Sequence, residues 1–382
     1  MNTRPPIETS PSTAVLSVSF NRDASCFSVG LDNGMCVFHT KSCILKASRD
    51  LKAGIGLVEM MGTTNYLAIV GGGRLQRYSS SKAIIWDDLK GKVAIEITTL
   101  TPVLGLRISR NRIVVALQNS VRVYAFAKPP ELIAKYETSD NPLGLSCMSD
   151  KIIAFPGRTV GQVQLVVVDS GDVHIIPAHT SALKAIALSP DGELLATASE
   201  KGTLIRVYVT KNRAKLVELR RGVDPATIFS LAFSPEGTKL ACTSDKSTLH
   251  VFDVPHNNAS ASPPISPSSS SMAGSGIFSG RPADDGKGRW GFLGKVPLLP
   301  RMFSDVYSFA NAQFEAGEDV LEQTTLGKKK PQKGAIGWIN EESLVVVGAG
   351  QNAKWEKFII TREEGRRCLV REGWKRYMGG TS

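Results

Sequence analysis

The sequence lacks a hydrophobic run long enough to cross a membrane. Its longest uncharged apolar stretches, such as Leu165 to Val168 and Leu344 to Gly350, are far shorter than the roughly 20 residues that a spanning helix needs. The N-terminal stretch MNTRPPIETSPSTAV has no apolar segment of the kind found in secretory signals, so no export signal is expected. The 6 cysteines form no CxxC pair, which favours reduced cytosolic thiols over disulfides.

Recognisable catalytic motifs are also missing. The sequence contains no GxSxG, HExxH or GxxxxGK[ST] motif, and its 5 histidines do not occur at metal-ligand spacing. The glycine run Gly71 to Gly73 is not followed by a predicted helix, so it indicates a tight turn. Asp87 and Asp88 are adjacent carboxylates, but a solvated turn is the simpler interpretation. We therefore expect no enzyme, no cofactor and no metal site.

Net charge is the clearest global property. The chain has 382 residues, with 46 Lys plus Arg against 35 Asp plus Glu, and therefore a formal charge of +11. Such a surplus suggests an anionic partner, which is a nucleic acid, a membrane surface or an acidic protein. Nucleic acid is not expected, because the basic residues are not concentrated in one arm or helix and no platform of aromatic and basic residues is visible.

An internal repeat organises the chain. The segments LKAIALSPDGELLATASEKGTLIRVY (183–208) and FSLAFSPEGTKLACTSDKSTLHVF (229–252) match at an offset of 45 residues, and 16–40 is a weaker copy. In each copy an apolar strand, a polar turn, a second strand, a second turn and a third strand follow one another. A period near 45 residues with three or four strands is typical of a β-propeller blade.

Four further segments fit the same plan less closely and complete a set of seven, namely 55–97, 102–138, 142–177 and 334–371. The predicted fold class is therefore all-β, a seven-bladed β-propeller over residues 14–371, with a flexible N-terminus (1–13) and a C-terminal tail (372–382). A β-sandwich or two small barrels are the alternatives. The propeller is favoured because the strand order repeats with similar turns.

One segment interrupts the sixth blade. Residues 255–290 contain 9 Ser, 5 Pro and 5 Gly, a composition that cannot bury enough apolar surface to fold alone. We predict a long disordered loop inside blade 6, after which VPLLPRMFSDVYSFA (296–310) supplies that blade's fourth strand. Towards its end the loop carries four bulky apolar residues, Ile277, Phe278, Trp290 and Phe292.

The candidate site is Leu219-Arg220-Arg221-Gly222, between the two strongest repeats. Successive side chains of an extended segment point to opposite sides, so the two arginines face different neighbours. A guanidinium offers a planar fork of donors that suits phosphate. The flanking blades supply small polar residues on both sides, which fits a multiply phosphorylated anion. From spacing alone, a surface Arg-Arg pair beside a polar network that locks the blades together is an equal alternative.

These motifs resemble the PROPPINs, the phosphoinositide-binding WD-repeat-like propellers that include the WIPI autophagy proteins. The resemblance is carried by LRRG between SEKGTLIRVY and SLAFSPEG, by AHTSALKAIALSPDG, by IVGGG with KAIIWDD, and by GWINEESLVVVG. It extends from about Val15 to Val370. Leu219, where other members have Phe, together with IIWDD, is similar to the subgroup of the shorter WIPIs and their yeast homologue.

The resemblance implies two rim pockets that bind phosphatidylinositol 3-phosphate and phosphatidylinositol 3,5-bisphosphate. The implied blade 5 pocket consists of His179, Thr180, Ser199, Thr203, Arg206 and Arg220. The implied blade 6 pocket consists of Arg221, Ser230, Thr243, Ser244, Thr248 and His250. Because the blade 6 repeat is one residue shorter at TLHVF, His250 is expected to have no direct counterpart in blade 5. In the family the blade 6 loop inserts into the bilayer, which assigns Ile277, Phe278, Trp290 and Phe292 to membrane insertion.

The resemblance further implies a cytoplasmic, peripheral membrane protein of autophagy and of endosome and vacuole traffic. It would lie on vacuole, endosome and pre-autophagosomal membranes, and we expect a monomer in solution. Its protein partner would be a large lipid-transfer autophagy protein bound through blades 2 and 3. The alternative function is a propeller scaffold that binds only proteins, with Arg220 and Arg221 in a structural role.

Overall fold

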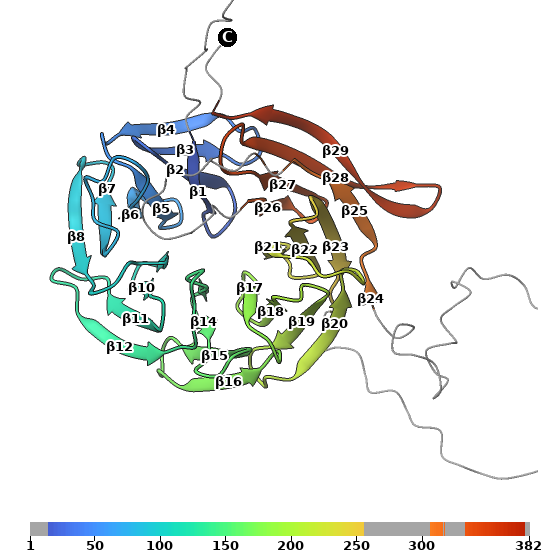
Figure 1. Ribbon diagram of the computed structural model, residues 1–382. Helices are drawn as coiled ribbons and strands as arrows, with labels where there is room; N and C mark the ends of the chain where they lie inside the picture. The colour runs from blue at the N-terminus through green and yellow to red at the C-terminus, as the bar shows by residue number, and fades with distance from the viewer. Residues whose placement is uncertain (1–13, 256–305, 316, 318–332, 379–382) are drawn as a thin grey trace, which may run out of the picture.

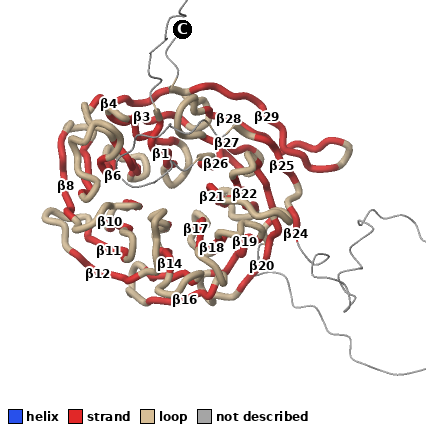
Figure 2. Tube along the Cα trace, viewed as in Figure 1, coloured by secondary structure: helices blue, strands red, loops and turns tan. Residues whose placement is uncertain are grey.

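A computed structural model describes residues 14–255, 306–315, 317 and 333–378 of the chain. In this part the chain forms seven sheets arranged in a ring around a central axis (Figure 1), and all its regular elements are strands (Figure 2). The prediction of a seven-bladed all-β propeller is confirmed. The predicted N-terminus 1–13 and nearly all of the predicted loop 255–290 lie outside the described residues.

The first four blades are antiparallel meanders whose first strand lies near the axis and whose fourth lies at the rim (Figure 1). Blade 1 comprises β1 (Val15–Phe20), β2 (Cys26–Leu31), β3 (Gly34–His39) and β4 (Leu45–Asp50). Blade 2 comprises β5 (Ile55–Met60), β6 (Tyr66–Gly71), β7 (Lys82–Asp87) and β8 (Lys92–Thr98). Blade 3 comprises β9 (Gly105–Ile108), β10 (Arg112–Ala116), β11 (Ser120–Ala125) and β12 (Leu132–Glu137). Blade 4 comprises β13 (Cys147–Met148), β14 (Ile152–Pro156), β15 (Gln162–Val167) and β16 (Val173–Pro177).

The last three blades include the repeats that are clearest in the sequence. Blade 5 comprises β17 (Leu183–Leu188), β18 (Leu194–Ser199), β19 (Leu204–Val209) and β20 (Lys215–Arg220). Blade 6 comprises β21 (Ile228–Phe233), β22 (Lys239–Ser244), β23 (Thr248–Asp253) and β25 (Ala310–Gln313). Blade 7 comprises β26 (Ala335–Asn340), β27 (Ser343–Val347), β28 (Lys354–Glu363) and β29 (Arg366–Arg376).

Packing between neighbouring blades explains why the second strands read as continuous apolar runs. All six residues of β2 and of β18 are buried, because both faces of these strands contact a blade. Between blades 5 and 6 the contact is made by fully buried Ala196, Leu219, Cys242 and Phe252. The outer strand β4 is mostly exposed, since nothing in the described chain covers it. The inter-blade cores therefore fix the angle at which adjacent rims meet.

The fourth strand of blade 6 differs from the prediction. It is β25, which begins at Ala310, where the predicted segment 296–310 ends. Two residues before it, β24 (Val306–Tyr307) pairs in parallel with β20 and adds a fifth strand to blade 5. The chain therefore crosses from the blade 5 rim to the blade 6 rim at 308–309. The sequence prediction was wrong here because the exposed edge of β20 captures the first residues that the blade 6 strand was expected to use.

Blade 7 closes the ring beyond the predicted boundary. β29 continues to Arg376, so the predicted tail beginning at 372 is in part a strand. Tyr377 follows it, packs edge-on against Phe27 and Phe38 of blade 1, and donates a hydrogen bond to the Gly348 carbonyl over 2.6 Å. The Trp355 indole donates to the Thr40 carbonyl over 2.9 Å. The propeller boundary of 371 was therefore wrong, because ring closure depends on residues after it.

Candidate functional site

The two arginines are separated by the end of strand β20. Leu219 is completely buried in the core between blades 5 and 6. Arg220 is the next residue of the same strand and so lies on the opposite face, which faces blade 4. Arg221 follows the strand, and its backbone N–H donates to the Thr203 carbonyl over 3.0 Å. The sequence Arg-Arg at a strand end thus sends its two side chains to different inter-blade spaces.

On the blade 4 side, a row of side chains crosses the sheet of blade 5. Thr197, Arg206 and Glu218 are cross-strand neighbours on β18, β19 and β20. The Thr197 hydroxyl shares a 3.0 Å hydrogen bond with His179 Nε2, and Arg206 Nε donates to Glu218 over 2.7 Å. Arg206 also donates to the Ala178 carbonyl over 2.6 Å. Four polar side chains from three strands and a connecting loop therefore form one network beside Arg220.

The remaining blade 5 candidates border this network. Ser199 is buried at the end of β18, Thr203 is half-buried in the following turn, and Thr180 is exposed next to His179. The positive φ of Gly202, +60°, allows the turn that presents the Thr203 carbonyl to Arg221.

On the blade 6 side, Arg221 is 9% exposed and is held by two carbonyls. Its Nε donates to the Gly202 carbonyl over 2.8 Å, and its Nη2 donates to the Asp224 carbonyl. These contacts occupy two of the five N–H donors of the guanidinium. Ser244 and Thr248 share a hydrogen bond of 3.0 Å, and His250 Nδ1 lies 3.1 Å from the Ser308 hydroxyl. Ser308 comes from the crossover between β24 and β25, and sequence inspection missed it because that stretch has no counterpart in the other repeats.

Comparison with known proteins identifies the family of the chain. The chain matches the PROPPIN family over residues 14–280. It is 50% identical to SVP1-like protein 2 of Neurospora crassa over 431 residues, covering 100% of both chains. The chain belongs to the PROPPIN family. PROPPINs are non-enzymatic, phosphoinositide-binding propellers, and the expectation that this chain is not an enzyme is confirmed by its membership.

Solved structures agree on the fold. Kluyveromyces lactis Hsv2 superposes with a TM-score of 0.72 at 22% identity, covering 96% of this chain and 100% of that one. KlAtg21, solved in a complex with the coiled coil of AgAtg16, superposes with a TM-score of 0.62 at 20% identity, covering 95% of this chain and 99% of that one. In the latter structure the propeller is bound to a protein partner.

His250 of this PROPPIN has a structural counterpart, contrary to the expectation from the repeat. It pairs with Cys242 on β22, as Arg206 pairs with Thr197 on β18, and Thr197 and Cys242 are 45 residues apart. The one-residue deletion lies in the turn before β23, so the strand pairing is restored before His250 is reached. His250 and Arg206 therefore occupy the same position in consecutive blades.

Ser230 and Thr243 lie on the other face of blade 6. They are cross-strand neighbours, and the Thr243 hydroxyl is fully buried and donates to the Gly334 carbonyl of blade 7 over 2.6 Å. Cys242 and Ser244, the neighbours of Thr243 in β22, face blade 5 instead. The structure therefore does not bring Ser230 and Thr243 together with Arg221.

This placement gives a prediction for Thr243→Val, which keeps the side-chain shape and removes the hydroxyl. We expect stability to fall by about 1–2 kcal/mol, because a buried carbonyl loses its donor, while headgroup binding stays unchanged. Urea unfolding and a headgroup titration measure the two effects. A loss of binding at unchanged stability would show that Thr243 reaches the ligand after all.

The pKa values of His179 and His250 are both lowered, so their imidazole rings are neutral at neutral pH. Burial lowers the pKa of His179 to about 4, and the Arg206 charge acts in the same direction. Burial and then Arg221 lower the pKa of His250 to about 4. Since the ordinary value is near 6.5, the unfolded chain binds more protons between pH 6.5 and 4, and folding stability falls as the pH is lowered through this window.

The pH prediction is that each histidine accounts for about 1–2 kcal/mol of the stability lost on acidification from pH 6.5 to 4. His179→Gln and His250→Gln should each flatten this dependence in thermal unfolding at a series of pH values. His174→Gln is the matched control, since His174 shares its hydrogen bond with exposed Arg213. Equal slopes in all variants would contradict the assignment.

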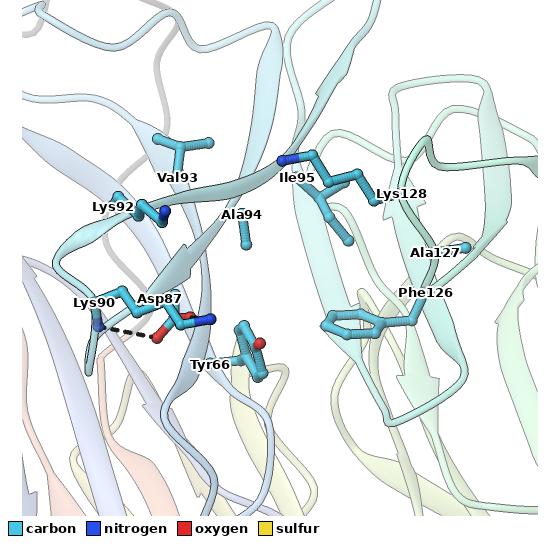
Figure 3. A pocket seen from close by; sticks show the side chains of 10 residues that line it. All are labelled: Tyr66, Asp87, Lys90, Lys92, Val93, Ala94, Ile95, Phe126, Ala127 and Lys128. Carbon is cyan, nitrogen blue, oxygen red and sulfur yellow. Dashed lines mark hydrogen bonds and ion pairs between the residues drawn. The ribbon is translucent and has the colours of Figure 1, made fainter.

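A separate hollow of about 320 Å³ lies at the rim between blades 2 and 3 (Figure 3). Its wall carries three lysines, Lys90, Lys92 and Lys128, around Tyr66 and Phe126, whose rings meet edge-on at 5.5 Å. The Asp87 carboxylate lies at its base, accepts a hydrogen bond from Asn65 over 2.6 Å, and is 3.7 Å from Lys90 Nζ. The solvated-turn interpretation was therefore wrong for Asp87, which is 2% exposed, is the last residue of β7, and is held by local partners.

The residues assigned to membrane insertion, Ile277, Phe278, Trp290 and Phe292, lie outside the described residues. In the described ranges, the chain forms no helix with the length and apolar character of a membrane span. Across the same ranges, no three His, Cys, Asp or Glu side chains are grouped so as to hold a metal ion.

Proposed function

We propose that this PROPPIN binds membranes peripherally by recognising phosphatidylinositol 3-phosphate and phosphatidylinositol 3,5-bisphosphate in two rim pockets. The supporting observation is the division of Arg220 and Arg221 between two polar networks on blades 5 and 6. One network contains His179, Thr197 and Arg206. The other consists of two hydrogen-bonded pairs, Ser244 with Thr248 and His250 with Ser308.

The chemistry of both networks suits phosphate. Arginine presents a planar fork of donors to phosphate oxygens, and hydroxyls supply further donors. A neutral histidine next to a bound dianion gains a proton readily, because the negative charge favours the imidazolium form. Two pockets on one rigid rim engage two headgroups of one bilayer, so their affinities multiply through effective concentration. The +11 net charge adds a general attraction to an anionic leaflet.

The second candidate function is a protein-binding scaffold in which the arginine pair is structural. It is favoured by the hydrogen bonds from Arg221 to the carbonyls of Gly202 and Asp224, which would tie blade 5 to its connection with blade 6 in the absence of any ligand. Under this alternative, replacing Arg221 would lower stability without changing any interaction with lipids.

Liposome sedimentation separates the two functions. Vesicles of phosphatidylcholine and phosphatidylserine are compared with and without 3-phosphorylated inositide, and with the 4-phosphorylated isomer at equal charge. The proposal expects binding that requires the 3-phosphate. Equal binding to the 3- and 4-phosphorylated lipids would mean that non-specific charge attraction explains the binding, and it would contradict the proposed function.

For the cellular role, we propose action in autophagy and in endosome and vacuole traffic, with the protein cytoplasmic and attached to those membranes. A propeller that docks only where 3-phosphoinositides are made would be recruited and released with the lipid. A monomer in solution fits this role, since both pockets lie on one chain.

The partner that we propose is a large lipid-transfer autophagy protein bound at blades 2 and 3. The hollow in Figure 3 supports this surface, because three lysines and two aromatic rings suit an acidic segment with an apolar anchor. Replacing Lys90, Lys92 and Lys128 by glutamate should reduce partner binding at least tenfold in a pull-down, while liposome binding keeps its requirement for the 3-phosphate and weakens only through the lost net charge. Unchanged partner binding would show that the interface lies elsewhere on the propeller.

A further inference from the structure

The two pockets differ at two charged positions, Arg206 and Glu218 of blade 5, whose equivalents in blade 6 are uncharged. In blade 5 the row across the sheet reads Thr197, Arg206, Glu218. In blade 6 the equivalent row reads Cys242, His250, Asn311. Because cross-strand neighbours share a face, each outer residue lies beside the central basic residue of its pocket. Glu218 therefore occupies in blade 5 the place that neutral Asn311 occupies in blade 6.

Glu218 is fixed in the blade 5 network by two basic side chains. Its carboxylate accepts from Arg206 Nε over 2.7 Å and lies 3.4 Å from Lys215 Nζ. Burial alone would raise its pKa, but the hydrogen bond and charge of Arg206 lower it, so the group is ionised at neutral pH. Leu219 points into the core, so Glu218 and Arg220 lie on the same face of β20. A phosphate that reaches Arg220 and Arg206 thus meets a fixed negative charge.

Blade 6 has no acid on the equivalent row. His250 contacts Ser308, and Asn311 lies opposite it on β25. The flanking residues of β25, Ala310 and Ala312, pack towards blade 7, so Asn311 faces blade 5 and the Arg221 side. The row contributes hydrogen-bonding groups without charge repulsion.

We propose that Glu218 is a specificity-determining residue, which offsets the charge of Arg206 and so restricts the blade 5 pocket to the less phosphorylated headgroup, whereas the blade 6 pocket accepts both headgroups. This inference rests on the proposed function. A carboxylate within a few ångströms disfavours each added phosphate, so its penalty grows with the phosphate count of the ligand. Arg206 must also share its guanidinium between Glu218 and the ligand.

The test uses soluble inositol 1,3-bisphosphate and inositol 1,3,5-trisphosphate as the two headgroups, titrated into the full-length chain. The Arg221→Ala substitution disables the blade 6 pocket, so that only the blade 5 pocket binds the headgroup. In that background, Glu218→Gln should raise the affinity for the trisphosphate roughly tenfold and for the bisphosphate roughly threefold. Glu193→Gln is the matched control, since it removes the same charge from blade 5 at a carboxylate that pairs with Lys151 over 2.7 Å.

The reciprocal variant is Asn311→Asp in an Arg220→Ala background, which leaves the blade 6 pocket. It should lower the affinity for the trisphosphate more than that for the bisphosphate. An unchanged affinity ratio in both reciprocal variants would overturn the inference, as would a weaker pocket in Glu218→Gln, which would make Glu218 a support for Arg206 instead. If neither Arg220→Ala nor Arg221→Ala alters headgroup binding, the proposed function itself fails and this inference with it.

Discussion

Replacing Arg220 and Arg221 together by threonine should reduce binding to vesicles with 3-phosphorylated inositide by at least about 100-fold. Hydrogen bonds to charged groups each contribute about 1.5–3 kcal/mol, and the double variant removes them from both pockets at once. Each single variant should retain weaker binding through the remaining pocket. Co-sedimentation over a range of lipid concentrations measures the loss.

The control for charge is Arg110→Thr with Arg112→Thr, which removes two positive charges from the turn after β9 and from the first residue of β10 in blade 3. It should weaken binding only slightly and in a salt-dependent manner. Thermal unfolding shows whether the Arg220 and Arg221 variants remain folded. Equal losses in the control and the site variant would mean that the chain senses only net charge.

Deleting residues 372–382 should destabilise the propeller by more than about 5 kcal/mol, or prevent it from folding. The deletion removes Tyr377, whose loss alone corresponds to about 3–5 kcal/mol for a buried aromatic residue. It also removes the last five residues of β29, and with them pairing to Lys354 and Trp355 of β28. Blade 7 would then have a shortened outer strand β29 and would contact blade 1 without Tyr377.

Deleting only residues 379–382 is the matched control, because β29 and Tyr377 remain. The variant with this shorter deletion should unfold at the same temperature as the full chain. If the longer deletion is equally stable, ring closure rests on the inner strands and on the Trp355 hydrogen bond to Thr40 instead.

Much of the fold could be predicted from the sequence because the sequence contains two clear copies of the blade repeat. The segments 183–208 and 229–252 define strand order, turn positions and a period of about 45 residues, from which the weaker blades are found. The segment after the 255–290 interruption has no such template. It divides between two blades, since β24 satisfies the open edge of β20 before β25 completes blade 6.

The site was predictable to the level of residue type but not of side-chain direction. Alternation along β20 separates Arg220 from Arg221, as the extended segment suggested. The same alternation sends Thr243 away from Ser244, and choosing between them requires knowing which face of β22 meets blade 5. Glu218 was overlooked because an acidic residue near an anion site argues against binding until its strand neighbours are known.

Isothermal titration with soluble inositol 1,3-bisphosphate tests the central claim most directly, since it counts pockets without a membrane. Two headgroups per chain are predicted for the unaltered protein, one for each of Arg220→Thr and Arg221→Thr, and none for the double variant. A single headgroup that survives both single variants, or two that survive the double variant, would contradict a pair of pockets divided between these arginines.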